Sequence, residues 1–112
     1  MARTLDVSRH QALWHNQEAV TLQRLNEDGN VVATTLVPEA LREAATTSIL
    51  VGDRIIAASD ATFWHLPQAV LGATAPAEKS YAILDSAGVR WIVWEGELAT
   101  WKTRWRLTCT KE

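Results

Sequence analysis

The sequence predicts a mainly β fold, a small antiparallel β-barrel or sandwich in a single domain covering residues 1–112. Three observations lead to this prediction. One strand–turn–strand pattern surrounds Asp28-Gly29, a second surrounds Asp85–Gly88, and the last strand, RWRLTCT, alternates polar and apolar residues. At 112 residues the chain is long enough for one hydrophobic core. A short N-terminal helix and a long mobile connection complete the predicted fold.

The composition is that of a folded chain with no strong electrostatic preference. Hydrophobic residues make up 47% of the chain and charged residues 21%, which excludes an intrinsically disordered segment. The net charge of −2 gives no overall attraction to nucleic acid or to an anionic membrane. No stretch resembles a membrane span or the apolar part of a signal peptide. We therefore expect a soluble protein that is made in a cytoplasm.

The first predicted element is a short helix at Ser8–His15. Ser8 has a side-chain oxygen suited to an N-cap, and Ala12–Trp14 give the segment a narrow apolar edge. Leu5 and Val7 fit an extended N-terminal arm equally well, and the sequence leaves both possibilities open.

A β-hairpin is predicted next. Val20–Leu25 and Val31–Val37 have strand composition, and Asp28-Gly29 between them supplies the positive φ that a tight turn needs. We expect Pro38 to end the second strand, because proline has no N–H to donate to a sheet.

Residues 38–60 are predicted to form a long, mobile connection. Glu39–Ser48 has the composition of a short helix but weak apolar spacing. Ser48–Ser59 contains β-branched residues on both sides of Gly52-Asp53, which fits a strand, a bulge and a strand. A connection of this length is unusual in a compact domain and is often functional. The alternative is that the segment folds back on the barrel as a helix or strand.

The remaining elements are predicted to be strands. Asp60–Pro67 alternates with bulky residues on both faces, as in a strand that is buried on both sides or lies at a subunit contact. At most one helical turn follows it. Tyr81–Thr110 is then predicted as a three-stranded meander, with a turn at Asp85–Gly88, a link at Glu95–Thr100 and a final strand at Lys102–Thr110.

The final strand combines tryptophan and arginine in a pattern with two interpretations. Basic and aromatic residues bind single-stranded nucleic acid when both lie on one open face. Here the alternation puts Trp105, Leu107 and Cys109 on one face and Arg104 and Arg106 on the other. We therefore predict that the first three residues build the core and that the arginines point outward. The same geometry argues against a tryptophan platform for sugars.

No recognisable catalytic or metal-binding motif occurs in the sequence. A nucleophile elbow, a phosphate-binding loop and a dinucleotide fingerprint are all absent. His10 and His15 are five residues apart, which does not stack two ligands on a helix face, and His65 has no partner at ligand spacing. Cys109, the single cysteine, is expected to be a small buried hydrophobe. We therefore expect no enzyme activity, no cofactor and no metal.

Two motifs in the C-terminal half carry a resemblance to a known family. One is a hairpin of the form I-x-D-x-x-G-x-x-W-x-V, and the other is a last strand with basic and aromatic residues and a terminal cysteine. The matching residues are Ile83, Asp85, Gly88, Trp91 and Val93 in the hairpin and Arg104–Leu107, Cys109 and Lys111 in the strand. Over roughly residues 60–111 the chain resembles the head–tail connector proteins of tailed phages, also called stopper, head-completion or head–tail joining proteins. PAEKSY stands where many relatives have Pro-x-x-Gly-Asp, so the resemblance does not select a subfamily.

The resemblance implies a small β-barrel that docks as a ring below the portal and adaptor proteins. Such a ring retains the packaged DNA and offers a surface for tail attachment, while a loop of each subunit projects into the channel. By position, residues 38–60 correspond to that loop. Its charged residues are candidate channel-loop residues: Glu39, Arg42, Glu43, Asp53 and Arg54. Their slight acidic excess would avoid trapping DNA by phosphate neutralisation.

Candidate residues for subunit or partner contacts are Trp94, Trp101, Arg104 and Arg106, because protein interfaces favour buried aromatic residues and arginine. The expected partners are further copies of the chain, portal and adaptor proteins, and tail proteins. DNA would pass through the channel without sequence-specific binding, and no membrane is involved. The expected location is the virion, assembled in the host bacterial cytoplasm. A tail terminator, a minor tail protein and a small nucleic-acid-binding β domain are the alternatives.

Overall fold

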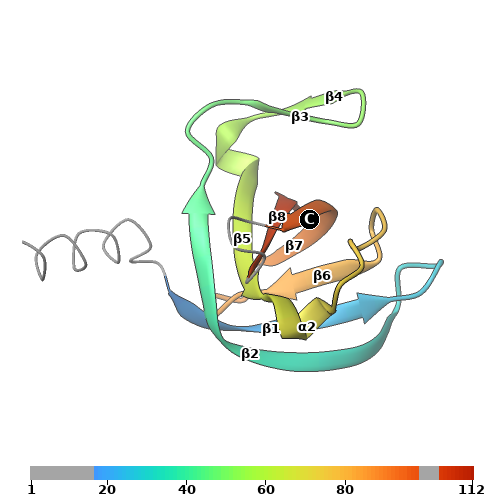
Figure 1. Cartoon of the computed structure of the whole chain (residues 1–112). Coiled ribbons are helices and arrows are strands. Elements are labelled where there is room, and N and C mark those ends of the chain that lie inside the picture. Colours follow the sequence, from blue (N-terminus) through green and yellow to red (C-terminus); the bar gives the residue numbers. More distant parts are fainter. Residues whose placement is uncertain (1–16, 99–103) are drawn as a thin grey trace, which may run out of the picture.

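The computed structural model describes residues 17–98 and 104–112, and the mainly β prediction is confirmed there (Figure 1). Within these residues six antiparallel strands close into a barrel in the order β1-β2-β5-β8-β7-β6. The barrel strands are β1 (Glu18–Leu25), β2 (Val31–Ala44), β5 (Ala61–Pro67), β6 (Tyr81–Leu84), β7 (Arg90–Leu98) and β8 (Arg104–Lys111). A separate hairpin consists of β3 (Ile49–Val51) and β4 (Arg54–Ile56). Two short helical segments, η1 (Ala58–Asp60) and α2 (Gln68–Leu71), flank β5.

The core lies inside the barrel, where the strand alternation predicted it. Trp105, Leu107 and Cys109 of β8 are buried, and so are Trp64 and Leu66 of β5. These side chains point inward because successive residues of a strand face opposite sides of the sheet. β1 pairs with both β2 and β6, so the sheet closes on itself and the barrel strands have no free edge.

Both predicted hairpin turns are confirmed. Gly29 and Gly88 have φ angles of +81° and +86°, which glycine adopts without steric cost. The second turn is also held by a side chain. Asp85 Oδ1 accepts hydrogen bonds from the backbone N–H groups of Ala87 and Val89, each at 2.9 Å. The β6–β7 turn is therefore stabilised by hydrogen bonds within its own sequence.

The prediction that Pro38 ends the second strand is wrong, because β2 continues beyond it. Val37 pairs with Val20 and Ala40 pairs with Glu18, so two residues of β2 lie opposite one residue of β1 and the register shifts. A proline is tolerated at such a bulge, where the ladder does not need an N–H from every residue. Past the bulge, β2 leaves β1 and pairs with β5, which turns the sheet toward closure.

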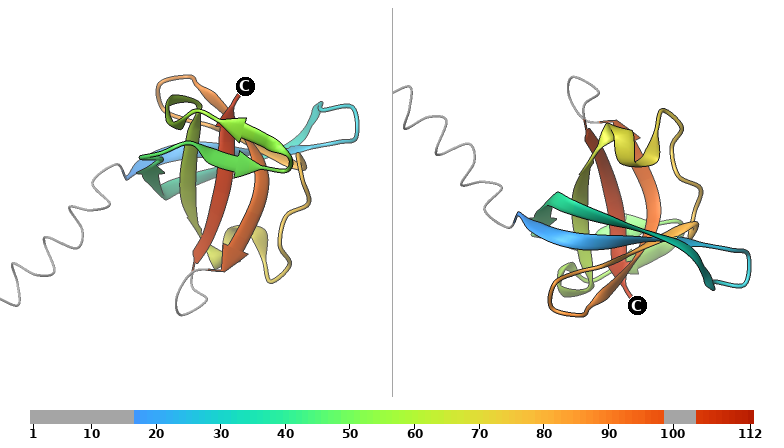
Figure 2. Two further views of the ribbon diagram at one scale, coloured as in Figure 1. Left: turned by 90° about the horizontal axis from the view of Figure 1, so that it is seen from above. Right: turned by 90° about the horizontal axis from the view of Figure 1, so that it is seen from below.

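Residues 38–60 are consequently not one long connection. Strand β2 replaces the expected short helix at the start of Glu39–Ser48. The strand–bulge–strand expected further on is instead a tight hairpin, in which β3 and β4 pair around Gly52-Asp53 and Gly52 has a φ of +62°. This hairpin stands off one end of the barrel in Figure 1 and lies across that end in Figure 2.

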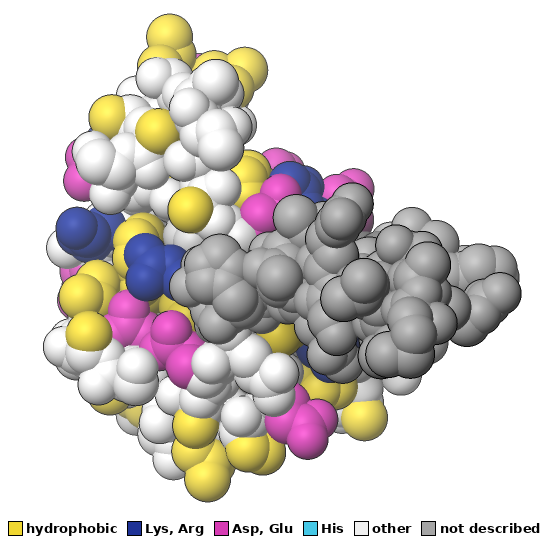
Figure 3. Space-filling view, turned by 90° about the vertical axis from the view of Figure 1, so that its left-hand side faces the viewer, with side chains coloured by type: hydrophobic (Ala, Val, Ile, Leu, Met, Phe, Trp, Pro, Cys, Tyr) yellow, Lys and Arg dark blue, Asp and Glu magenta, His cyan; other side chains and the backbone are white. Residues whose placement is uncertain are grey.

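The β3–β4 hairpin has one inward and one outward face. Val51 is buried, whereas the cross-strand partners Leu50 and Ile55 are 66% and 77% exposed. Hydrophobic side chains are visible at the top of the space-filling view, where the hairpin stands (Figure 3). The hairpin thus presents two branched aliphatic side chains to solvent.

The predicted link at Glu95–Thr100 begins as strand, because β7 continues to Leu98 and pairs with β8. Position 96 of this strand is glycine for a steric reason. A Cβ at Gly96 would lie 2.7 Å from Leu107 Cδ2 and 3.1 Å from Pro76 Cδ. Glycine here permits close packing, a non-local requirement that local sequence does not reveal.

The predicted helix at Ser8–His15 lies outside the described residues. The single helical turn expected after the central strand is confirmed as α2. The carbonyl oxygen of Gly72, directly after α2, accepts a 2.8 Å hydrogen bond from Trp105 Nε1. The turn is thereby tied to one end of the barrel core.

Candidate functional site

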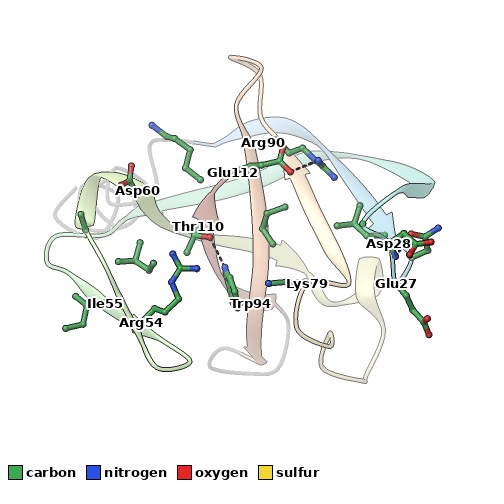
Figure 4. A pocket seen from close by; sticks show the side chains of 17 residues that line it. Glu27, Asp28, Arg54, Ile55, Asp60, Lys79, Arg90, Trp94, Thr110 and Glu112 are labelled. Atoms are coloured by element: carbon green, nitrogen blue, oxygen red, sulfur yellow. Dashed lines mark hydrogen bonds and ion pairs between the residues drawn. The ribbon is translucent and has the colours of Figure 1, made fainter.

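A groove of about 780 Å³ lies on the outside of the barrel between two projecting segments. One wall comes from β4 and η1, the other from the β1–β2 turn at residues 26–29, and β7 and β8 contribute the floor. In Figure 4, Arg54 and Ile55 stand on one side of this groove and Glu27 and Asp28 on the other. Charged, aromatic and aliphatic side chains from distant parts of the chain therefore meet here.

Trp94 supplies the aromatic part of the floor. The register between β7 and β8 shifts between Val93 and Glu95, so Trp94 occupies a bulge in the ladder. Bulges redirect the side chain that they carry. The indole Nε1 donates a 2.7 Å hydrogen bond to Thr110 Oγ1, which fixes the half-buried ring in one orientation.

Lys79 lies over this ring, with its Nζ 4.6 Å from the ring centroid, in a cation–π contact. Among the described residues it is the only one other than glycine with a positive φ, +58°. Such a conformation costs a lysine about 1–2 kcal/mol. The backbone N–H of Lys79 donates a 2.9 Å hydrogen bond to the Val93 carbonyl, beside the bulge. Two backbone irregularities thus direct one cation and one aromatic ring into the same groove.

The cations of the groove are largely unneutralised. Arg54, Lys79 and Lys111 line it, and none of them forms an ion pair with another residue in the described ranges. Figure 4 shows Arg54 and Lys79 approaching Trp94 from two sides. Asp60 lines the same part of the groove, since the adjoining Ala61 pairs with Thr110 next to Lys111. This part of the groove, defined as its basic end, therefore carries a net positive charge.

The other charged side chains that line the groove form one ion pair on its floor and an acidic surface on its opposite wall. Arg90 Nη1 lies 2.7 Å from Glu112 Oε2, so these two side chains offset each other. Glu27 and Asp28 on the opposite wall form no ion pair with any described residue. The β1–β2 turn is consequently an exposed acidic surface.

A second polar cluster covers the outer face of β2, β5, β7 and β8. Arg106 donates hydrogen bonds to Glu43 and Glu97, both at 3.3 Å, and its guanidinium carbon lies 3.9 Å from the Phe63 ring centroid. His65 Nε2 lies 2.9 Å from Glu43 Oε1. Arg106 points outward, as predicted, but its side chain is already bound within the subunit.

This cluster has a defined charge state at neutral pH. Burial lowers the pKa of His65, and the hydrogen bond to Glu43 offsets this only in part. Burial alone would raise the pKa of Glu43, but hydrogen bonds from His65 and Arg106 outweigh it, so that the pKa is lowered. At neutral pH a neutral His65 therefore lies beside an ionised Glu43.

Arg42 lies at the end of the barrel rather than in a loop. Its guanidinium carbon is 4.9 Å from the Trp91 ring centroid and 5.7 Å from that of Trp64. Its Nε donates a 3.3 Å hydrogen bond to Thr62 Oγ1. The side chain is half-buried and closes one barrel end by stacking on aromatic rings.

The structure separates the predicted site residues. Trp94 and Arg54, predicted for different roles, meet in the groove. Arg104 and Arg106 lie away from it, and Arg104 Nη1 is 3.5 Å from the Glu39 carbonyl oxygen. The expected loop position is wrong for three channel-loop candidates, which belong to strand β2: Glu39, Arg42 and Glu43. Asp53 and Arg54 do lie in the projecting hairpin, and Trp101 lies outside the described residues.

The contribution of Lys79 was not predicted from the sequence. It lies in the segment PAEKSY, which has no periodicity, and its positive φ depends on contacts with β7. Lys111 falls on the same face of the last strand as Trp105, Leu107 and Cys109, so the alternation gave no signal for it, and its Nζ lies 5.8 Å from the Trp91 ring centroid. The acidic turn was visible as Glu27-Asp28, but its place opposite the basic end required the barrel to close.

Reactive groups in the described residues are few. Cys109 is fully buried, and burial strongly raises the pKa of its thiol, which confirms the prediction of a small buried hydrophobe. The described part of the chain contains no group of three or more His, Cys, Asp and Glu residues placed to hold a metal ion. None of its helices has the length and apolarity needed to cross a membrane.

No protein-family model, no curated protein and no solved structure matches this chain. The groove and the exposed hairpin are the two candidate binding surfaces. Together they provide binding surfaces of mixed charge with aromatic and aliphatic components.

Proposed function

We propose that this protein is a structural subunit of a tailed-phage head–tail connector, the stopper. In this role it docks as a ring below the portal and adaptor proteins, retains packaged DNA and offers the surface for tail attachment. The observation that carries the proposal is the β3–β4 hairpin. It falls within residues 38–60, the segment that the family resemblance assigns to the channel, and it projects from one end of a closed barrel (Figure 1).

The exposure of this hairpin supports a role in assembly. Leu50 and Ile55 are cross-strand partners, and both are largely exposed although Val51 on the other face is buried. Burying one such side chain is worth about 1.5–3 kcal/mol. An isolated subunit gains nothing from exposing the pair, whereas a contact repeated around a ring would gain this energy in every subunit.

A second apolar surface supports the ring itself. Val31, Val32 and Leu36 on β2 are 44%, 51% and 68% exposed, and they lie in the β1–β2 ribbon rather than in the hairpin. A closed ring joins two different surfaces of each subunit, because every copy contacts one neighbour on each side. The chain offers two such separate surfaces.

One observation favours a second candidate, a small nucleic-acid-binding domain. Trp94, Lys79 and Arg54 share one open groove, which is the arrangement that stacking and phosphate contacts require. Glu27 and Asp28 line the same groove and would repel phosphates. The connector function is therefore preferred.

Density-gradient fractionation tests the proposal. The source strain would be induced, the particles separated and each fraction probed for this chain. We expect it in DNA-filled heads at a few copies per particle, and we expect its deletion to yield filled heads that leak DNA. Recovery in tails alone would favour the tail terminator or minor tail protein. Recovery only as a free monomer at the top of the gradient would contradict all three roles.

Leu50→Ser/Ile55→Ser provides a sharper test of the hairpin. Both side chains are solvent-exposed, so the variant should keep the melting temperature of the wild type. We expect it to fail in DNA retention when it replaces the wild-type chain. Thr46→Ala/Thr47→Ala, two exposed positions before the hairpin, is the matched control and should retain DNA.

A further inference from the structure

We propose that the acidic β1–β2 turn of one copy docks on the basic end of the groove of a second copy. The acidic turn is Glu27-Asp28, and the basic end is Arg54 and Lys79 beside Trp94 together with Lys111, whose Nζ lies 5.8 Å from the Trp91 ring centroid. The inference deepens the proposed function and rests on its ring, because it names the two surfaces that join neighbouring subunits.

The acidic turn is rigid and projects from the barrel. Figure 2 shows the end of the β1–β2 ribbon extending beyond the other strands in both views. Asn26 Oδ1 accepts hydrogen bonds from the N–H groups of Asp28 and Asn30, at 3.0 and 2.9 Å, and the Asn26 carbonyl accepts one from Gly29. The backbone of a turn held in this way has little entropy left to lose on binding.

The charges of the two surfaces are complementary. The basic end has three cations against the one carboxylate of Asp60, and the Arg90–Glu112 pair adds no net charge. The turn adds two carboxylates that have no ion-pair partner among the described residues. Docking would bring these unneutralised charges together, which gives specificity and faster association.

Apolar side chains accompany the charges on both surfaces. Val31 and Val32 follow the turn and are about half exposed, at 44% and 51%. In the groove, Trp94 and Ile55 offer aromatic and aliphatic area beside Arg54. Tryptophan and arginine side by side in a recess are typical of residues that dominate binding energy.

The occupant is another copy rather than the same one. Within a single subunit the acidic turn and the basic end form opposite sides of the groove, and no ion pair joins them among the described residues (Figure 4). In the proposed ring each copy places its turn in the groove of the next copy, and such a head-to-tail contact closes into a ring when the rotation between copies allows.

Charge reversal on the full-length chain tests the contact. Variant A is Glu27→Lys/Asp28→Lys, and variant B is Arg54→Glu/Lys79→Glu. Sedimentation velocity at low ionic strength would measure association over a range of concentrations. We expect wild type to associate and each variant alone to associate about 100-fold more weakly, because like charges then face each other. An equimolar mixture of A and B should associate again, since the turn of each matches the groove of the other.

Controls separate charge effects from misfolding. Glu39→Lys/Glu95→Lys changes the net charge by the same amount as variant A, at exposed positions outside the groove, and should associate like wild type. Arg54→Ala/Lys79→Ala is the milder version of variant B, and circular dichroism would confirm that each variant is folded. A monomeric wild type, full association of A or B, or an A and B mixture that remains monomeric would each overturn the inference.

The outcomes also distinguish this contact from the proposed function. If A and B associate normally and the chain still travels with DNA-filled heads, the contact is wrong and the connector function stands. If the mixture recovers association but the chain is absent from particles, the contact stands and the connector function is wrong. Oligonucleotide binding by a monomeric wild type that is lost in variant B would overturn the contact in favour of a nucleic-acid site.

Discussion

Asp85→Ala is expected to destabilise the protein strongly, because one carboxylate joins the β6–β7 turn to the core. Asp85 Oδ1 accepts the backbone N–H groups of Ala87 and Val89, each at 2.9 Å, and Oδ2 accepts the indole N–H of Trp91 at 3.0 Å. The carboxylate is 7% exposed and the tryptophan 2% exposed. Water therefore has little access to replace the hydrogen bond to the indole N–H.

The magnitude follows from the groups that the substitution leaves unpaired. A buried indole N–H without an acceptor costs about 1–3 kcal/mol. Loss of the two backbone hydrogen bonds in the turn, which water can partly replace, adds about 1–2 kcal/mol. The free energy of unfolding should fall by about 2–5 kcal/mol in total. For a domain of this size the melting temperature should drop by roughly 10–20 °C.

Urea unfolding followed by tryptophan fluorescence measures this change. Asp85→Asn keeps one carbonyl acceptor, which can serve the turn or the indole N–H but not both, so it should cost less than alanine. Trp91→Phe removes the N–H but keeps an aromatic ring, so the double variant Asp85→Ala/Trp91→Phe leaves no unpaired indole N–H. It should therefore cost at least about 1 kcal/mol less than the sum of the single changes. Additive costs, or a loss below about 1 kcal/mol for Asp85→Ala, would refute the reasoning.

Three further changes probe packing and titration. Gly96→Ala should lower the free energy of unfolding by about 1–3 kcal/mol, because its Cβ would lie 2.7 Å from Leu107 Cδ2; an unchanged urea midpoint would contradict this. Stability should be highest above about pH 6.5, because folding lowers the pKa of His65 from 6.5 and that of Glu43 from 4.5. The free energy of unfolding should fall below pH 6.5, because the unfolded chain then binds more protons at His65, and again below pH 4.5, because Glu43 is then protonated. In a pH series of melting temperatures, His65→Gln should remove the first decline. The Cys109 thiol, buried with a raised pKa, should resist iodoacetamide in the folded protein and react in urea; full labelling of the folded chain would argue against this burial.

Local sequence determined the elements whose signals lie within a few residues. The alternation of Trp105, Leu107 and Cys109 defined the buried face of the last strand, because side chains in a strand repeat every two residues. Gly29 and Gly88 marked two turns, since only glycine adopts a positive φ without steric cost. These features follow from backbone geometry and can be predicted without knowledge of distant contacts.

The tertiary structure decided the features that depend on residues distant in sequence. Pro38 remains within a strand because a bulge opposite β1 removes the need for its N–H, and beyond that bulge β2 pairs with β5, a partner distant in sequence. Strand β7 needs glycine at position 96 because Leu107 and Pro76 approach its backbone closely. The groove depends on the same closure. It brings Arg54, Lys79 and Trp94 together from three separate segments, and no local pattern encodes a distance between segments so far apart in the chain.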